Sequence, residues 1–199
     1  MSHPKLTPRG EATRARIVEA AADLVLAGGV GGTSLDDIRA GTSTSKSQLF
    51  HYFPGGKSEL VGAISSFQAE RVLAAQEPYL SRLASWDDWH GWRDAVVRHY
   101  GSQSHWGCPI GALANELHGT DAPRAAEVAA QMEHWRGYLE AGIARLRDAG
   151  EISAEADPHS LSVAVFASLQ GGLLLIASAE SIEPLEDALD GALAMLRAA

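Results

Sequence analysis

The side chains best suited to chemistry in this 199-residue chain lie close together, between Ser45 and Lys57. An ammonium group (Lys46), a carboxamide (Gln48) and an imidazole (His51) follow one another at short spacing. A glutamine amide can pair with the edge of adenine, and a lysine can reach guanine or a phosphate. A helix that only fills a core would be apolar there. The stretch therefore predicts contact with nucleic-acid bases.

Two short helices and a polar turn are expected to position these groups. Ser34, with Asp37 three residues later, is a variant of the capping box and starts a helix that runs to about Gly41. Ser45 can cap the next helix, over residues 46–53, and Pro54-Gly55-Gly56 stops it. This order is typical of a helix-turn-helix.

The remaining elements are also predicted to be helical. The 3.6-residue period dominates the chain and β-type alternation is nearly absent, which predicts an all-α fold. A first helix, from Pro8 to Ala27, is ended by Gly28-Gly29. The later helices are expected from 57 to about 76, over 86–100, from Pro109, over 128–146 with Gly150 after it, over 158–178 and over 184–197.

Charge and composition limit the compartment and the partners. The net charge is −9, which argues against indiscriminate coating of nucleic acid. Residues 1–60 hold seven Lys/Arg against six Asp/Glu, whereas residues 61–199 hold nine against nineteen. The start of the first helix is rich in basic residues: Arg9, Arg14 and Arg16. They lie either beside a phosphate backbone or in solvent as ordinary surface charge.

Cys108 is the single cysteine and no signal peptide is visible, so we expect a cytoplasmic protein.

The N-terminal 60 residues resemble the DNA-binding domain of the TetR family of bacterial regulators. The stretch 107–113 is similar to one in LmrA/YxaF-type members of that family. Two positions depart from the family pattern: Ser43 stands where glycine is usual and Thr44 where valine is usual. A left-handed serine costs about 1 kcal/mol relative to glycine, so either the turn takes another shape or the helices absorb the strain. The similar N-terminal stretches are Thr33–Ile38, Ser45–Phe53 and Lys57–Leu60.

The resemblance implies an N-terminal three-helix helix-turn-helix DNA-binding domain, joined through a shared helix to a C-terminal helical ligand-binding and dimerisation domain. We place these domains at residues 1–56 and 57–199. The implied function is a ligand-responsive transcriptional regulator without a cofactor, a repressor released from a palindromic operator in double-stranded DNA by a small organic effector. Phe50 occupies a position that is often a phosphate-binding tyrosine, and we expect it to pack beneath its helix instead. The expected DNA contacts are Thr33, Ser34, Thr44, Ser45, Lys46, Ser47, Gln48, His51, Tyr52 and Lys57.

A homodimer is expected to form through the last two helices. The segment from Ser160 to Ala179 carries no charge and is long enough to span a bilayer, but its serines and its glycine pair favour a helix buried on nearly all sides in a soluble protein. A partner subunit is a natural cover for it. Gly171 and Gly172 would allow close helix approach, or would merely kink a core helix.

The C-terminal part suggests a ligand pocket, although aromatic residues at helical spacing also describe a plain core. Gln170 is notable because an amide among apolar residues needs a partner: a ligand, a water or the other subunit. The candidate ligand-binding residues are Trp106, Met132, Trp135, Phe166 and Gln170.

Two other chemistries are weighed against this interpretation. His105, Cys108 and His118 could bind a metal, but no further ligand completes the set, and Cys108 could sense redox state or be an inert buried thiol. We therefore expect no metal site. The rival function is an all-α enzyme or small-molecule binding protein without DNA binding. No nucleotide-binding fingerprint and no paired nucleophile and base support an enzyme.

Overall fold

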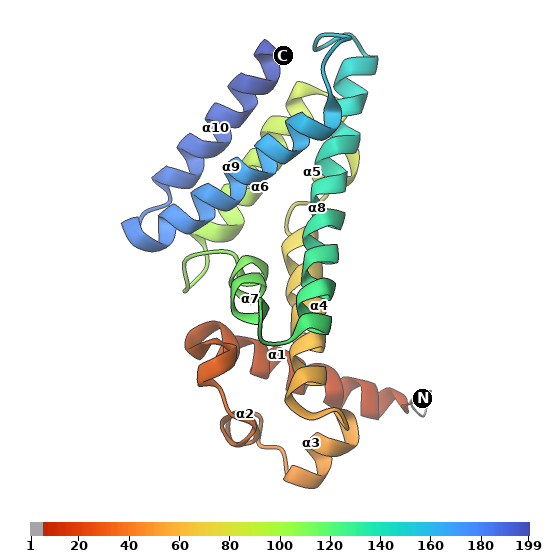
Figure 1. The fold of residues 1–199 in the computed structure, drawn as a ribbon, viewed down its shortest axis with the longest axis vertical. Coiled ribbons are helices and arrows are strands. Elements are labelled where there is room, and N and C mark those ends of the chain that lie inside the picture. The colour runs from red at the N-terminus through yellow and green to blue at the C-terminus, as the bar shows by residue number, and fades with distance from the viewer. Residues whose placement is uncertain (1–5) are drawn as a thin grey trace. The chain divides into compact units, whose positions relative to one another are not determined.

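The computed structural model describes residues 6–199, which form ten helices and no strand within that range (Figure 1). The all-α prediction is confirmed. The helices are α1 (Pro8–Gly32), α2 (Leu35–Thr42), α3 (Lys46–Tyr52), α4 (Gly56–Ala74), α5 (Tyr79–Arg82), α6 (Trp86–Gly101), α7 (Pro109–Leu117), α8 (Ala122–Asp148), α9 (Pro158–Ala179) and α10 (Glu183–Ala198).

Nine of these helices lie where the sequence pattern predicts them. The exception is α5, which the pattern missed because a single turn of four residues is too short to show a helical period. The predicted end of α1 is nearly right. Gly29 breaks the helix with φ 72° and ψ 163°, and a short helical stretch continues to Gly32. A glycine adopts this positive φ without steric penalty.

The chain divides into two compact units. Unit one contains the chain up to Ala69 together with Ala112–Val128, and unit two contains Glu70–Gly111 and Ala129–Ala199. The division falls between Ala69 and Glu70, inside α4, so the two units share this helix. A segment from the second half of the chain thus belongs with the N-terminal helices, which no local sequence pattern indicates.

The core of unit one forms around α1. Ile17, Ala21 and Val25 are buried on one face of this helix, and α1 packs against α2. The ring of Phe53 is completely buried, and the Arg14 guanidinium lies over it at 4.9 Å from the ring centre. Arg14 therefore packs on the core, so its place in the first helix needs no phosphate to explain it.

The core of unit two contains a buried amide that makes three hydrogen bonds. Gln76 Oε1 accepts the indole N–H of Trp92 at 2.7 Å and that of Trp135 at 3.0 Å, and its Nε2 donates to the Val72 carbonyl at 2.7 Å. The glutamine and both tryptophans are buried. A buried amide with such partners fixes the positions of both tryptophan rings.

Helix α9 packs along α10 (Figure 1). A Cβ atom at Gly172 would lie 3.0 Å from the Leu185 Cα, so the two helices approach closely at this glycine. By length and composition α9 could cross a membrane, with a mean hydropathy of 1.9, and 33% of its most apolar window is buried inside the structure. The single chain covers only part of this helix, and the expected burial on nearly all sides includes a partner subunit as cover. An exposed apolar side remains.

The turn between α2 and α3 keeps its left-handed residue despite the missing glycine. Ser43 has φ 50° and ψ 42°, and its N–H caps the end of α2 by donating to the Ala40 and Arg39 carbonyls. The turn therefore takes the shape expected for glycine, and the strain of a left-handed serine is accepted.

Replacing this serine tests the strain directly. We expect Ser43→Gly to raise the free energy of unfolding by about 0.5–1 kcal/mol, because glycine adopts a positive φ without a Cβ clash. Ser47→Gly, at an exposed helical position, should instead lower it by about 0.5–1 kcal/mol. Urea denaturation measures both values. A loss of stability in Ser43→Gly would contradict a strained turn.

Candidate nucleic-acid interface

The first turn of α3 is held by reciprocal capping. The Ser45 hydroxyl accepts the Gln48 N–H at 3.1 Å, and Gln48 Oε1 accepts the Ser45 N–H at 3.2 Å. Below the helix, Leu49 and Phe53 are buried. Cap and core together orient a helix of only seven residues.

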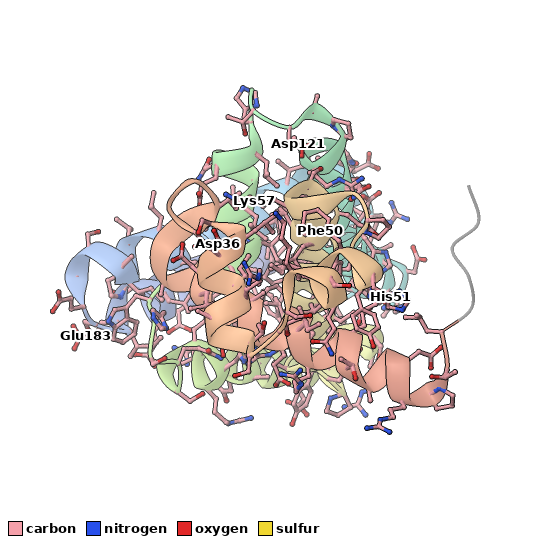
Figure 2. The ribbon with its side chains drawn as sticks, turned by 90° about the horizontal axis from the view of Figure 1, so that it is seen from below. Asp36, Phe50, His51, Lys57, Asp121 and Glu183 are labelled. Carbon is pink, nitrogen blue, oxygen red and sulfur yellow. The ribbon has the colours of Figure 1, made fainter. Side chains whose placement is uncertain are left out.

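The opposite side of α3 is open to solvent. Lys46, Ser47, Gln48 and His51 are all exposed, as base contact requires. Figure 2 views the molecule from the end that carries α3 and labels His51 on this helix. Gln48 differs from the expectation in one respect. Its Oε1 already accepts the Ser45 N–H, so bidentate pairing with adenine needs either a second hydrogen bond to that oxygen or a break in the cap.

The turn before α3 is anchored to α1 through Arg16. The Arg16 guanidinium donates to the Thr42 carbonyl at 2.7 Å, and the Thr42 hydroxyl donates to the Ile38 carbonyl. Arg16 thus satisfies a carbonyl at the end of α2. The basic residues of the first helix were expected either beside a phosphate backbone or as solvated charge. Arg14 and Arg16 fit neither explanation, because both have partners inside the protein.

Two of the expected DNA contacts point inward. Thr33 is 4% exposed and its hydroxyl donates to the Gly29 carbonyl at 2.8 Å. Thr44 is 6% exposed and its hydroxyl is paired with the Thr42 hydroxyl and carbonyl. Neither hydroxyl can reach a phosphate from this position, so the structure does not support these two side chains as contacts. Ser34 is exposed but closes the capping box of α2 with Asp37, which explains its presence without DNA.

The expectation that Phe50 packs beneath α3 is wrong. Phe50 is 41% exposed, whereas Phe53 is completely buried and takes the place in the core; Figure 2 labels Phe50 on α3. Tyr52 is half-buried, and its ring meets that of His51 edge-on at 5.0 Å. Tyr52 can still offer its hydroxyl to a phosphate.

Lys57, one of the expected DNA contacts, lies in the first turn of α4. The Gly55 N–H just before this helix donates to Glu59 Oε2 at 2.7 Å, so the helix start already has a carboxylate partner. The half-buried Lys57 forms no ion pair with a carboxylate of residues 6–199. The same is true of Lys46 and Arg9 within the described residues.

An open groove of about 430 Å³ lies between the start of α1 and α3. Arg9 and Tyr52 are among the residues that line it. A strand of DNA backbone is a suitable occupant for a groove lined this way. The lining residues are Leu6, Thr7, Arg9, Gly10, Thr13, Gln48, His51 and Tyr52.

The segment 112–128 is attached to unit one by two carboxylates. Glu116 Oε2 accepts the Val30 N–H at 2.6 Å and the Gly31 N–H at 3.3 Å, just after the break in α1. Asp121 accepts the Ser58 hydroxyl at 2.6 Å, and this hydrogen bond, followed by that from the Arg124 N–H, lowers the pKa of Asp121. Nothing in the local sequence around Glu116 signals this role.

The candidate ligand-binding residues are only partly brought together. Trp135 and Phe166 meet edge-on at 5.2 Å, and Phe166 lies one turn before Gln170 on α9. Trp135 is completely buried and its N–H is bound to Gln76, so it belongs to the core. Trp106 is 37% exposed and Met132 is half-buried. Tyr100 and Cys108 lie near Gln170, and neither is among the candidate ligand-binding residues.

Within residues 6–199 no group of three or more His, Cys, Asp or Glu side chains could hold a metal ion. Cys108 is buried, and burial raises the pKa of its thiol. A buried thiol with a raised pKa is a poor nucleophile.

Comparison with known proteins agrees with this geometry. Residues 17–64 match the family model described as bacterial regulatory proteins of the tetR family, and residues 82–192 match the tetracyclin repressor-like C-terminal domain. The HTH-type transcriptional regulator LmrA of Bacillus subtilis is 27% identical over 177 residues, covering 87% of this chain and 90% of that protein. An uncharacterised HTH-type regulator of Lactococcus lactis is 27% identical over 185 residues, covering 89% and 90%.

A solved structure shows the same fold. The crystal structure of a TetR transcriptional regulator from Chloroflexus aurantiacus superposes with a TM-score of 0.78 at 27% identity and covers 94% of each chain. Proteins of this kind are regulators and not enzymes, so the rival enzyme hypothesis is not retained. The chain belongs to the TetR family of DNA-binding transcriptional regulators.

Proposed function

We propose that this regulator is a repressor that binds a palindromic operator as a homodimer and is released by a small organic molecule. The observation that carries the DNA-binding part is the open side of α3, where Lys46, Ser47, Gln48 and His51 are exposed on a capped and packed helix. In helix-turn-helix proteins such a helix enters the major groove and its first residues face the base edges. Such a protein acts in the cytoplasm.

Phosphate contacts would hold this helix in register. Arg9 and Tyr52 line the groove beside α3, and Lys57 stands at the start of α4. The exposed Ser45 and Ser47 complete the proposed interface. We keep residues 1–56 as the proposed DNA-binding domain, with Lys57 as its first contact from the following helix.

The homodimer would form through α9 and α10. On one side of α9, Val163 is 47% exposed, Leu174 71% and Leu175 54%, and no charged residue lies between residues 160 and 179. Nothing lies within 4 Å of the position that a Cβ would take at Gly171. An exposed apolar stripe of this kind favours a partner subunit. Two copies of α3 would then reach successive turns of DNA about 34–36 Å apart.

The effector response would pass through α7. This helix begins at Pro109 in unit two and ends at Leu117 in unit one, where Glu116 holds the end of α1. A ligand that prefers one arrangement of α7 would shift the population away from the DNA-binding form. Such coupling between a ligand and DNA typically changes the free energy of DNA binding by about 1–3 kcal/mol.

The base contacts can be tested on a DNA fragment selected for binding to the unaltered protein. Lys46→Ala with Gln48→Ala should weaken retention in a gel shift by about 100-fold or more, since each base contact contributes about 1–3 kcal/mol. Arg147→Ala, on α8, serves as the control and should bind normally. Undiminished binding by the double variant would reject α3 as the recognition helix.

The proposed pairing of Lys57 with a phosphate predicts a change in salt dependence. The plot of log affinity against log salt concentration should become shallower in Lys57→Ala by about 0.9 for each phosphate that the ammonium group neutralises. Fluorescence anisotropy between low and moderate salt measures this slope, and Arg147→Ala should leave it unchanged. An identical slope in Lys57→Ala would exclude a phosphate at this lysine.

The dimer can be broken at the stripe on α9. We expect Leu174→Glu to give monomers in analytical ultracentrifugation while the helical circular dichroism is kept, because it places a charge on an apolar contact. Ala149→Glu, an exposed position at the end of α8, should remain dimeric. A dimeric Leu174→Glu variant would place the interface elsewhere.

A further inference from the structure

Three polar side chains meet in the interior of unit two. They are Tyr100 on α6, Cys108 just before α7 and Gln170 on α9. The Cys108 sulfur accepts the Gly111 N–H at 3.3 Å, and a Cβ at Gly111 would lie 3.2 Å from Gln170 Oε1. Tyr100 and Gln170 both lie near this sulfur.

Two donors of this cluster have no acceptor other than the Cys108 sulfur, a weak acceptor that the side chains of Tyr100 and Gln170 approach without good hydrogen-bond geometry. The Tyr100 hydroxyl and Gln170 Nε2 are buried, and neither has hydrogen-bond geometry to any group within residues 6–199. Tyr100 as a whole is 2% exposed. Gln76 in the same unit shows the contrast, since its amide is paired on both sides. Buried donors are normally paired, so two donors that have only the Cys108 sulfur near them point to a stronger acceptor that binds there.

The cluster is electrically neutral. Burial raises the pKa of the Tyr100 hydroxyl, and the neighbouring Cys108 adds to this effect. Burial also raises the pKa of Cys108. The backbone N–H groups of Gly111 and Ile110 and the side chains of Tyr100 and Gln170 act in the opposite direction and lower this pKa, but burial has the larger effect. None of these influences is a charged side chain. An anion or a cation would lose its hydration here without gaining an opposite charge.

An aromatic surface adjoins the cluster. Phe166 lies one turn before Gln170 on α9 and contacts the Trp135 ring edge-on at 5.2 Å. We propose that Tyr100 and Gln170 form the polar end of a binding site, where both donate to one carbonyl oxygen of an uncharged aromatic molecule. A carbonyl oxygen has two lone pairs and can accept both bonds. That this molecule is the effector rests on the proposed function, but the binding itself does not.

The free protein provides the first test. Tyr100→Phe and Gln170→Leu should leave the melting temperature unchanged or raise it, because each removes a buried donor without a partner. Gln76→Leu is the matched control and should lower it by about 5–15 °C, since two indole N–H groups lose their acceptor. A fall of similar size in the first two variants would mean that protein or trapped water already pairs these donors, and would overturn the proposal.

Ligand binding provides the second test, with acetophenone, benzoate and benzylamine as neutral, anionic and cationic probes. Calorimetry should show acetophenone binding to the unaltered protein, with affinity reduced about tenfold in Tyr100→Phe and in Gln170→Leu. Benzoate and benzylamine should bind at least about tenfold more weakly than acetophenone. No acetophenone binding at millimolar concentration, equal affinity in the variants, or tighter binding of either ion would each overturn the site.

A parallel gel shift separates this proposal from the proposed function. Both variants should bind the selected DNA normally without a probe, and acetophenone should release DNA from the unaltered protein only. Acetophenone binding without any effect on DNA would reject the effector role and leave the site intact. DNA release by acetophenone that persists in both variants would reject the site and leave the regulator intact.

Discussion

Reciprocal capping between Ser45 and Gln48 fixes the first turn of α3, and every proposed base contact depends on it. A helix of seven residues is unstable by itself, so its direction must come from the cap, from the buried Leu49 and Phe53, and from the turn that Arg16 anchors. The same constraint limits recognition. Gln48 serves the cap and the DNA at once, so base pairing by its amide is coupled to the integrity of the helix start.

The sequence was informative where structure is local. Serine followed three residues later by aspartate or glutamine is a capping signal. Helices α2 and α3 begin directly after Ser34 and Ser45, the serines that this signal identifies. For Ser43, which stands where glycine is usual, the sequence left two outcomes open, and the structure shows the left-handed turn.

Prediction failed where side-chain direction depends on distant parts of the chain. Thr33 and Thr44 look like phosphate ligands by residue type, but their hydroxyls pair with carbonyls that only the folded turn brings near. Phe50 was expected beneath α3 because it is aromatic, while Phe53 takes that space. Glu116 joins unit one from a sequence separation of 86 residues from Val30, for which no local pattern exists. The proposed ligand donors come from helices far apart in the sequence, so Gln170 was noticed alone and Tyr100 was missed.

Two glutamines of unit two differ in how their amides are used. Gln76 makes three hydrogen bonds and holds two tryptophans together, whereas Gln170 Nε2 is buried without a hydrogen bond of good geometry. The central claim, however, concerns DNA: paired copies of α3 recognise two equal half-sites. Sequencing of fragments that the purified protein retains from a random DNA pool tests it most directly. The account predicts an inverted repeat with half-site centres separated by about one helical turn or a whole multiple of it. Retained fragments that share no motif, or share one without two-fold symmetry, would contradict it.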